Sequence, residues 1–162
     1  MRPFSRRTFG SFWAFLAELW YQLVHLPALL RAGRSKAIPG DFRERLLLAV
    51  TAVNQCRYCS WAHSRAALAA GVSHEETEQL LRGVVDLDRP AEVPALYYAQ
   101  HWAERGGRPD AAAEEKLQAT YGGETSQHIR TLLRAIHFAN LFGNSCDRLL
   151  HTLSFGRLGN GA

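Results

Sequence analysis

The chain has 162 residues, 47% of them hydrophobic, and a formal net charge of +4 at pH 7. A chain of this length buries a sufficient core without disulfide or metal staples, so we expect one domain. Three cysteines are too few for the disulfide framework of a secreted protein, which makes the cytoplasm the default location. No run of Lys and Arg with interleaved aromatic residues predicts a nucleic-acid groove, so we expect no nucleic-acid partner.

The first thirty residues combine an arginine pair with an aromatic helical pattern. The segment 5–9, Ser-Arg-Arg-Thr-Phe, resembles part of a twin-arginine export signal. Residues 11–30 are too often interrupted, by Glu18, Gln22 and His25, to span a bilayer, and no small-x-small cleavage site follows. Apolar residues recur there at helical spacing: Phe12, Phe15, Leu16, Leu19, Leu23 and Leu26. We predict a helix that packs on the core or on a partner subunit, with targeting or membrane-surface binding as the alternative.

The remaining pattern predicts an all-α fold, a bundle of about seven helices with no sheet. Leu and Ala are plentiful, and no useful stretch alternates apolar and polar residues at period two. Capping residues and glycines mark the expected helix ends. After the first helix, we expect helices over residues 41–53, 56–70, 73–83, 94–105 and 110–121, then a long helix that ends at Gly143 and a last helix that ends at Gly156.

Residues 56–63 read Cys-Arg-Tyr-Cys-Ser-Trp-Ala-His and carry the strongest functional signal. On a helix, Cys59 and His63 are i and i+4 neighbours, so the imidazole can take the thiol proton directly or through one water. Cys56 is within disulfide reach of Cys59 but lies about 10 Å along the helix from His63. The helix dipole favours a thiolate at Cys56 instead. We expect the base to prevail and Cys59 to have the lower pKa.

Glu44 joins this site if the helix over 41–53 stops around Asn54 and Gln55 and the chain then folds back. In one unbroken helix, Glu44 would lie about 18 Å from the first cysteine. A reversal would place Glu44, ten residues before the turn, opposite His63, nine residues after it. Asn tolerates the left-handed conformation that ends helices, and the four preceding residues are a weak helical stretch. The carboxylate would orient the imidazole and raise its basicity.

This arrangement resembles the alkylhydroperoxidase D-like branch of the carboxymuconolactone decarboxylase family. The matching pattern is Glu, eleven residues, then C-x-x-C-x-x-x-H, at Glu44, Cys56, Cys59 and His63. The resemblance runs from residues 43–46 to the turn at 71–76 and more loosely beyond. It implies an all-helical domain without a cofactor or metal. It also implies a thiol-dependent peroxidase or disulfide oxidoreductase, because the lactone decarboxylases lack the cysteine pair.

The resemblance implies a role for each of these residues. Cys59 would attack a hydroperoxide and Cys56 would resolve the product to a disulfide. His63 would act as base through water, with Glu44 supporting it. An external dithiol or reductase would then reduce the disulfide. The resemblance also implies a homo-oligomer, a trimer or a hexamer. One departure is Tyr58, where well-studied peroxidases of this branch carry a further histidine.

The single domain over residues 1–162 would then have three parts. Residues 1–33 form the N-terminal amphipathic helix and bend, residues 41–83 the helical core with the redox motif, and residues 94–156 the C-terminal helices. We expect no part of this domain to enter a membrane.

Other interpretations of the motif stay open. One is a general disulfide oxidoreductase or redox sensor with weak peroxidase activity. Another is a non-enzymatic helical assembly or a zinc-binding module, in which Cys146 or His137 would supply the fourth ligand. We otherwise expect Cys146 to be a buried apolar residue near a helix start. A c-type haem is excluded because Ser60, not histidine, follows the second cysteine.

Overall fold

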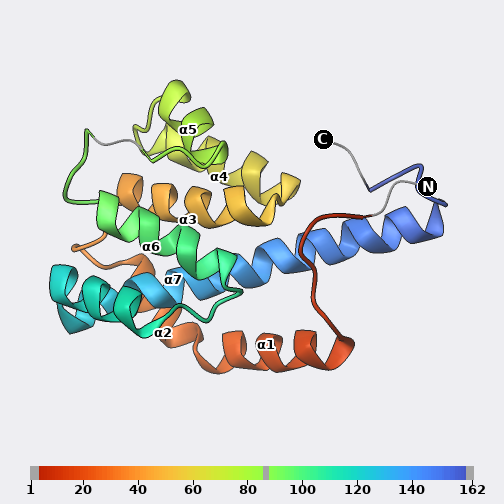
Figure 1. Cartoon of the computed structure of the whole chain (residues 1–162), viewed down its shortest axis with the longest axis horizontal. Coiled ribbons are helices and arrows are strands. Elements are labelled where there is room, and N and C mark those ends of the chain that lie inside the picture. Colours follow the sequence, from red (N-terminus) through yellow and green to blue (C-terminus); the bar gives the residue numbers. More distant parts are fainter. Residues whose placement is uncertain (1–3, 86–87, 160–162) are drawn as a thin grey trace.

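The computed structural model describes residues 4–85 and 88–159, so residues 1–3 of the predicted N-terminal part, 86–87 and 160–162 lie outside the described residues. The fold is all-α, as predicted, and the described residues contain no strand (Figure 1). The helices are α1 (Phe12–Val24), α2 (Leu26–Gly33), α3 (Gly40–Asn54), α4 (Arg57–Ala69), α5 (His74–Leu81), α6 (Val93–Glu104) and α7 (Ala111–Leu153). Among the described residues, no helix is both long and apolar enough to cross a lipid bilayer.

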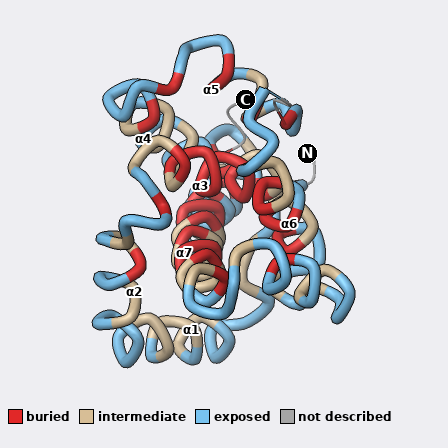
Figure 2. Tube along the Cα trace, turned by 90° about the vertical axis from the view of Figure 1, so that its left-hand side faces the viewer, coloured by how far each residue is buried: buried red, intermediate tan, exposed pale blue. Residues whose placement is uncertain are grey.

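Helix α3 is the centre of the bundle. It contacts α4, α5, α6 and α7, and Figure 2 shows that its residues are mostly buried. The continuous apolar run at 46–50 fits this position, because a helix surrounded on all sides has no solvent face to fill with polar residues. The helix thereby carries Glu44 and the start of the α3–α4 turn into the interior of the molecule.

The chain reverses between α3 and α4 where predicted, around Asn54 and Gln55, and Gln55 is the residue that ends the helix. Gln55 adopts the left-handed conformation, with φ 55° and ψ 39°, and its backbone N–H donates to the Thr51 carbonyl at 2.7 Å. Asn54 instead remains helical and buried, since its carbonyl accepts a hydrogen bond from Asn144 and its side chain donates one to His137. Tertiary hydrogen bonds therefore decide which residue ends the helix.

The predicted end at Gly143 is wrong, because α7 continues through this residue to Leu153. The predicted break at Gly122 is confirmed: this residue has the non-helical angles φ 75° and ψ 170°, and the chain turns back there, since Glu114 pairs with Arg130 at 2.9 Å. Gly143 lies against α4, and a Cβ atom there would be 2.8 Å from the Cys56 sulfur. This glycine permits a close approach of two helices, so it does not mark a helix end.

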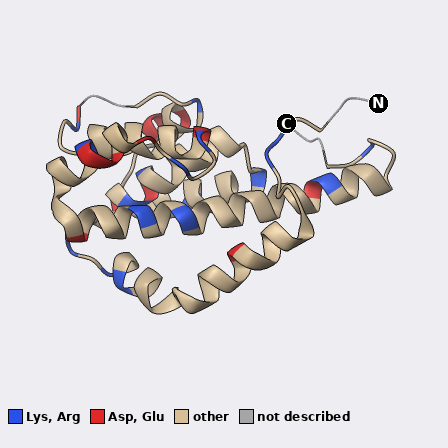
Figure 3. Ribbon diagram, turned by 60° about the horizontal axis from the view of Figure 1, so that its bottom comes forward, with Lys and Arg blue, Asp and Glu red and all other residues tan. Residues whose placement is uncertain are grey.

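The predicted helix over residues 11–30 is two helices, because Pro27 opens α2 in its first turn. No residue of α1 is fully buried, so packing on the core is only partial. Phe15 stacks on Phe138 and Phe142 of α7. Most of α1 is uncharged (Figure 3), and the acidic residue in its sequence, Glu18, pairs with Arg134 of α7 at 2.8 Å. The outer face of α1 remains apolar and exposed.

Candidate redox-active site

The two motif cysteines lie at the start of α4, with their sulfur atoms 3.1 Å apart and reduced. Cys56 is the N-cap, and its sulfur accepts a hydrogen bond from the backbone N–H of Cys59. Cys56 is fully buried, whereas Cys59 is only partly buried. An incoming molecule therefore meets the sulfur of Cys59 first.

The surroundings of the pair place the thiolate on Cys56. The hydrogen bond from the Cys59 thiol, helped by backbone N–H groups and the charge of Arg6, lowers the Cys56 pKa to about 6 although burial opposes it. The pKa of Cys59 is raised, because its proton serves that same hydrogen bond and burial disfavours a second charge. The expectation that Cys59 has the lower pKa is therefore wrong for the reduced pair. The helix start and Arg6 act on Cys56 directly, whereas the base lies a turn beyond Cys59.

Glu44 and His63 are brought together as the fold-back predicts. His63 Nδ1 lies 2.8 Å from Glu44 Oε2, and Glu44 is buried at 6% exposure. With Nδ1–H donating to the carboxylate, neutral His63 keeps Nε2 as a proton acceptor. In the described structure His63 has no hydrogen bond to Cys59. Proton transfer between them therefore needs a bridging water or a small rotation of the ring.

A polar face of α7 supports the dithiol from behind, and the sequence analysis missed it. Its polar members follow one another after four and three residues and contact the α3–α4 turn and the start of α4: Asn140, Asn144 and Asp147. Gly143 lies on the same face. Asn140 donates to the Thr51 hydroxyl at 3.3 Å, and Asn144 donates to the Asn54 carbonyl at 2.7 Å. The signal in the sequence is this helical spacing of polar residues within an otherwise apolar pattern.

Asp147 ties three chain segments together beside the dithiol. Its side chain has no exposed surface and pairs with Arg6 at 2.8 Å and Arg57 at 2.7 Å. The Tyr58 hydroxyl donates to the same carboxylate at 2.8 Å. Tyr58, the departure from the family pattern, thus fixes the start of α4 to α7. Arg6 holds the N-terminal segment against the same site.

His137 and Cys146 do not join the dithiol. His137 Nδ1 accepts a hydrogen bond from the Asn54 amide at 2.9 Å, and burial, with the nearby charge of Arg7, lowers its pKa to about 4. Cys146 is exposed within α7, so the expectation of a buried residue near a helix start is wrong. Among the described residues, no group of three or more His, Cys, Asp and Glu side chains is placed to hold a metal ion.

Comparison with known proteins places the site within a family. A model of the carboxymuconolactone decarboxylase family matches residues 22–104, slightly more than half of the chain. The matched segment contains Glu44, Cys56, Cys59 and His63, whereas α7 lies outside it. No curated protein and no solved structure gives a significant match. On the family match, the chain belongs to the carboxymuconolactone decarboxylase family.

Proposed function

We propose that this protein is a thiol-dependent peroxidase of the alkylhydroperoxidase D-like branch. It reduces hydroperoxides while Cys56 and Cys59 cycle between dithiol and disulfide. The observation that supports this most is the 2.8 Å hydrogen bond between Glu44 of α3 and His63 of α4. The same helix α4 begins at a pair of sulfur atoms that lie 3.1 Å apart. A merely structural cysteine pair needs neither a base nor a carboxylate that orients it.

The first step uses Cys59, the less buried of the two cysteines, and the base. His63 Nε2 takes the Cys59 proton through a water, and the sulfur attacks the terminal oxygen of the hydroperoxide. The O–O bond breaks, Cys59 becomes a sulfenic acid, and the proton on His63 passes to the departing alkoxide, which leaves as an alcohol. Glu44 stabilises the imidazolium that forms between these two transfers.

The second step uses the thiolate already present. The Cys56 thiolate attacks the Cys59 sulfur and expels hydroxide, which becomes water when it takes a proton from solvent. The sulfur atoms start 3.1 Å apart and need to close by about 1 Å to reach disulfide length. An external dithiol then donates two electrons and two protons, which restores the reduced pair. The low pKa of Cys56 thus serves resolution, whereas His63 serves peroxide attack.

The proposal includes a homo-oligomer, a trimer or a hexamer. It is supported by a run of exposed apolar residues on α1 and α2: Phe12, Trp13, Trp20, Leu23, Val24, Leu26 and Leu30. Faces of this kind on a protein surface usually mark a contact with another molecule. Analytical ultracentrifugation of the parent protein tests the assembly. If this face is the contact between subunits, a variant with both Trp13→Glu and Trp20→Glu should sediment as a smaller species.

A disulfide oxidoreductase acting on proteins is the second candidate. It is favoured by the exposed aromatic side chains beside Cys59, since Trp61 is 65% and Tyr58 45% exposed. Such side chains suit a protein partner better than a small peroxide. Rates with hydroperoxide and with a protein disulfide, measured on the same preparation, distinguish the two activities.

Trapping of the sulfenic acid tests the peroxidase directly. In a Cys56→Ser variant, the Cys59 sulfenic acid has no resolving partner and should be labelled by dimedone after one equivalent of cumene hydroperoxide. A Cys59→Ser variant should give no label at Cys56, and Cys146→Ser is the matched control that should behave as the parent protein. If both motif variants are labelled equally, or if neither is labelled, Cys59 is not the sulfur that attacks the peroxide.

A further inference from the structure

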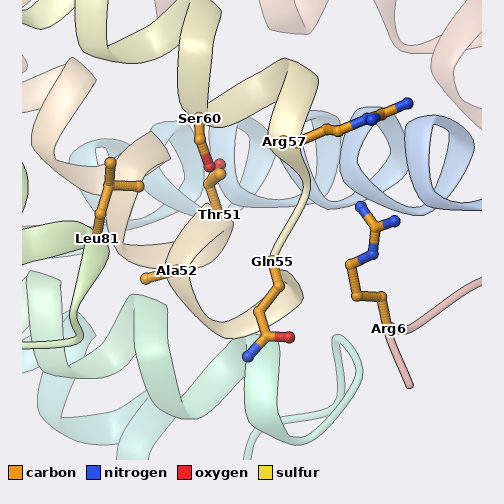
Figure 4. Close-up of a pocket in the computed structure, with 7 residues that line it drawn as sticks. All are labelled: Arg6, Thr51, Ala52, Gln55, Arg57, Ser60 and Leu81. Atoms are coloured by element: carbon orange, nitrogen blue, oxygen red, sulfur yellow. The ribbon is translucent and has the colours of Figure 1, made fainter. Parts of the chain in front are cut away.

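A cavity of about 480 Å³ lies at the α3–α4 turn and the start of α4, and neither cysteine is among the residues that line it. Seven residues line it: Arg6, Thr51, Ala52, Gln55, Arg57, Ser60 and Leu81. Gln55 and Arg57 flank Cys56 in the chain, and Ser60 follows Cys59, so the cavity adjoins the redox motif (Figure 4). Its volume falls within the range of small-molecule sites, about 300–1,000 Å³.

One side of the cavity is positively charged. The guanidinium groups of Arg6 and Arg57 lie near each other on the side opposite Leu81 (Figure 4). Both pair with the single carboxylate of Asp147, at 2.8 and 2.7 Å. One negative charge balances only one of the two positive charges, so the cluster keeps a net charge of about +1.

The carboxylate of this cluster is enclosed, whereas one of its two guanidinium groups is partly exposed. The Asp147 side chain has no exposed surface, whereas that of Arg57 is 40% exposed. The Arg6 side chain is 9% exposed and also donates to the Gly159 carbonyl, which fixes its position. Arg57 binds Tyr58 and Asp147 through Nη2 alone, so within the described part of the chain its Nε and Nη1 groups remain open donors.

We infer that this cavity binds a carboxylate, and that the hydroperoxide that the enzyme prefers carries one. The second half rests on the proposed function, whereas carboxylate binding needs no turnover. A guanidinium group forms paired, charge-assisted hydrogen bonds with a carboxylate, and Arg57 has the open donors for it. Ala52 and Leu81 offer an apolar wall for a short hydrocarbon body between the carboxylate and the O–O bond.

A matched pair of substrates tests the preference. Cumene hydroperoxide and its para-carboxylate differ only in the charged group. We expect kcat/KM to be at least about tenfold higher for the carboxylate, as one charge-assisted contact allows. In Arg57→Gln this ratio of kcat/KM values should fall to about 1. Arg57→Lys keeps the positive charge but cannot form two parallel hydrogen bonds, so its ratio should lie between those of Arg57→Gln and the parent protein. Arg65 lies on the same helix, but its guanidinium stacks on the Trp61 ring and it does not line the cavity. Arg65→Gln should therefore keep the ratio of the parent protein. A ratio of about 1 in the parent protein overturns the inference.

Binding of a non-reactive analogue separates this inference from the proposed function. Calorimetry with para-isopropylbenzoate should show binding to the parent protein and Arg65→Gln, and at least about tenfold weaker binding to Arg57→Gln. If neither peroxide is reduced but this dependence on Arg57 holds, the peroxidase fails and the carboxylate site stands. If both peroxides react equally and binding ignores Arg57, the carboxylate site fails and the peroxidase stands.

Discussion

Gly143 of α7 faces the Cys56 sulfur so closely that a Cβ atom on this glycine would lie 2.8 Å from it. Such a distance is well inside van der Waals contact, so any larger residue has to displace the sulfur or the helix. The sulfur is also held by the backbone of α4 as its N-cap. Two helices from opposite halves of the chain thus fix the position of the Cys56 sulfur.

Replacing this glycine should disturb the dithiol more than it disturbs the fold. We expect Gly143→Ala to slow disulfide formation by about tenfold and to lower the free energy of unfolding by about 1–3 kcal/mol, as overpacking does. Gly123→Ala is the matched control, since it lies in the same helix with no atom within 4 Å of its added Cβ. Stopped-flow oxidation and urea unfolding measure the two effects. Equal oxidation rates in both variants would contradict the role of the close contact.

The Glu44–His63 pair should control the peroxide step. His63→Gln removes the base and should lower the rate of Cys59 oxidation by about 10²–10⁴-fold. Glu44→Gln keeps the ring but removes the charge that orients it, so its loss should be smaller. His74→Gln, an exposed histidine at the start of α5, is the control and should not alter the rate. If Cys59 is oxidised as fast in His63→Gln as in His74→Gln, His63 is not the base of the peroxide step.

In the reduced protein, Cys56 should be a thiolate at neutral pH. Because the Cys56 pKa is lowered to about 6, the sulfur is protonated, and a poor nucleophile, below that pH. In the reduced protein, the thiolate absorbance of Cys56 should therefore be lost as the pH falls through about 6. Cys59→Ala removes the strongest cause of this low pKa, so the midpoint of thiolate absorbance should move upward. A midpoint unchanged in Cys59→Ala would show that the hydrogen bond between the sulfurs does not set the charge.

Asp147 should hold the N-terminal segment against the bundle. Asp147→Asn leaves Arg6 and Arg57 without a charged partner, one of them nearly buried, and should cost about 3–5 kcal/mol of unfolding free energy. Trypsin should also cut faster after Arg6 in the folded variant. Glu115→Gln, which removes an exposed carboxylate of the helix before Gly122, is the control and should change stability by less than about 0.5 kcal/mol. If trypsin cleavage and stability are unchanged in Asp147→Asn, Asp147 does not hold the N-terminal segment against the bundle.

The sequence predicted the parts of the site that depend on local periodicity. Cys59 and His63 share a face of one helix, and Glu44 meets His63 because a single turn reverses the chain. The contribution of α7 was missed, because Gly143 has the signature of a helix end and its real role depends on contact with a residue 87 positions earlier in the chain. The Arg6 contact is equally remote.

The charge of the cysteine pair shows the same limit. Spacing alone indicated that His63 would make Cys59 the thiolate. The actual balance depends on the N-cap position of Cys56, the charge of Arg6 and burial of both sulfurs, which only the tertiary structure fixes. Local pattern therefore identifies the candidate groups of the site, whereas long-range packing decides which cysteine carries the charge.

The most direct test of the dithiol cycle is peptide mapping after oxidation with one equivalent of cumene hydroperoxide. The account predicts a disulfide between Cys56 and Cys59 in nearly every molecule, with Cys146 still free and one alcohol released per disulfide. A disulfide that contains Cys146, or a motif pair that stays reduced while the peroxide is consumed, would contradict it.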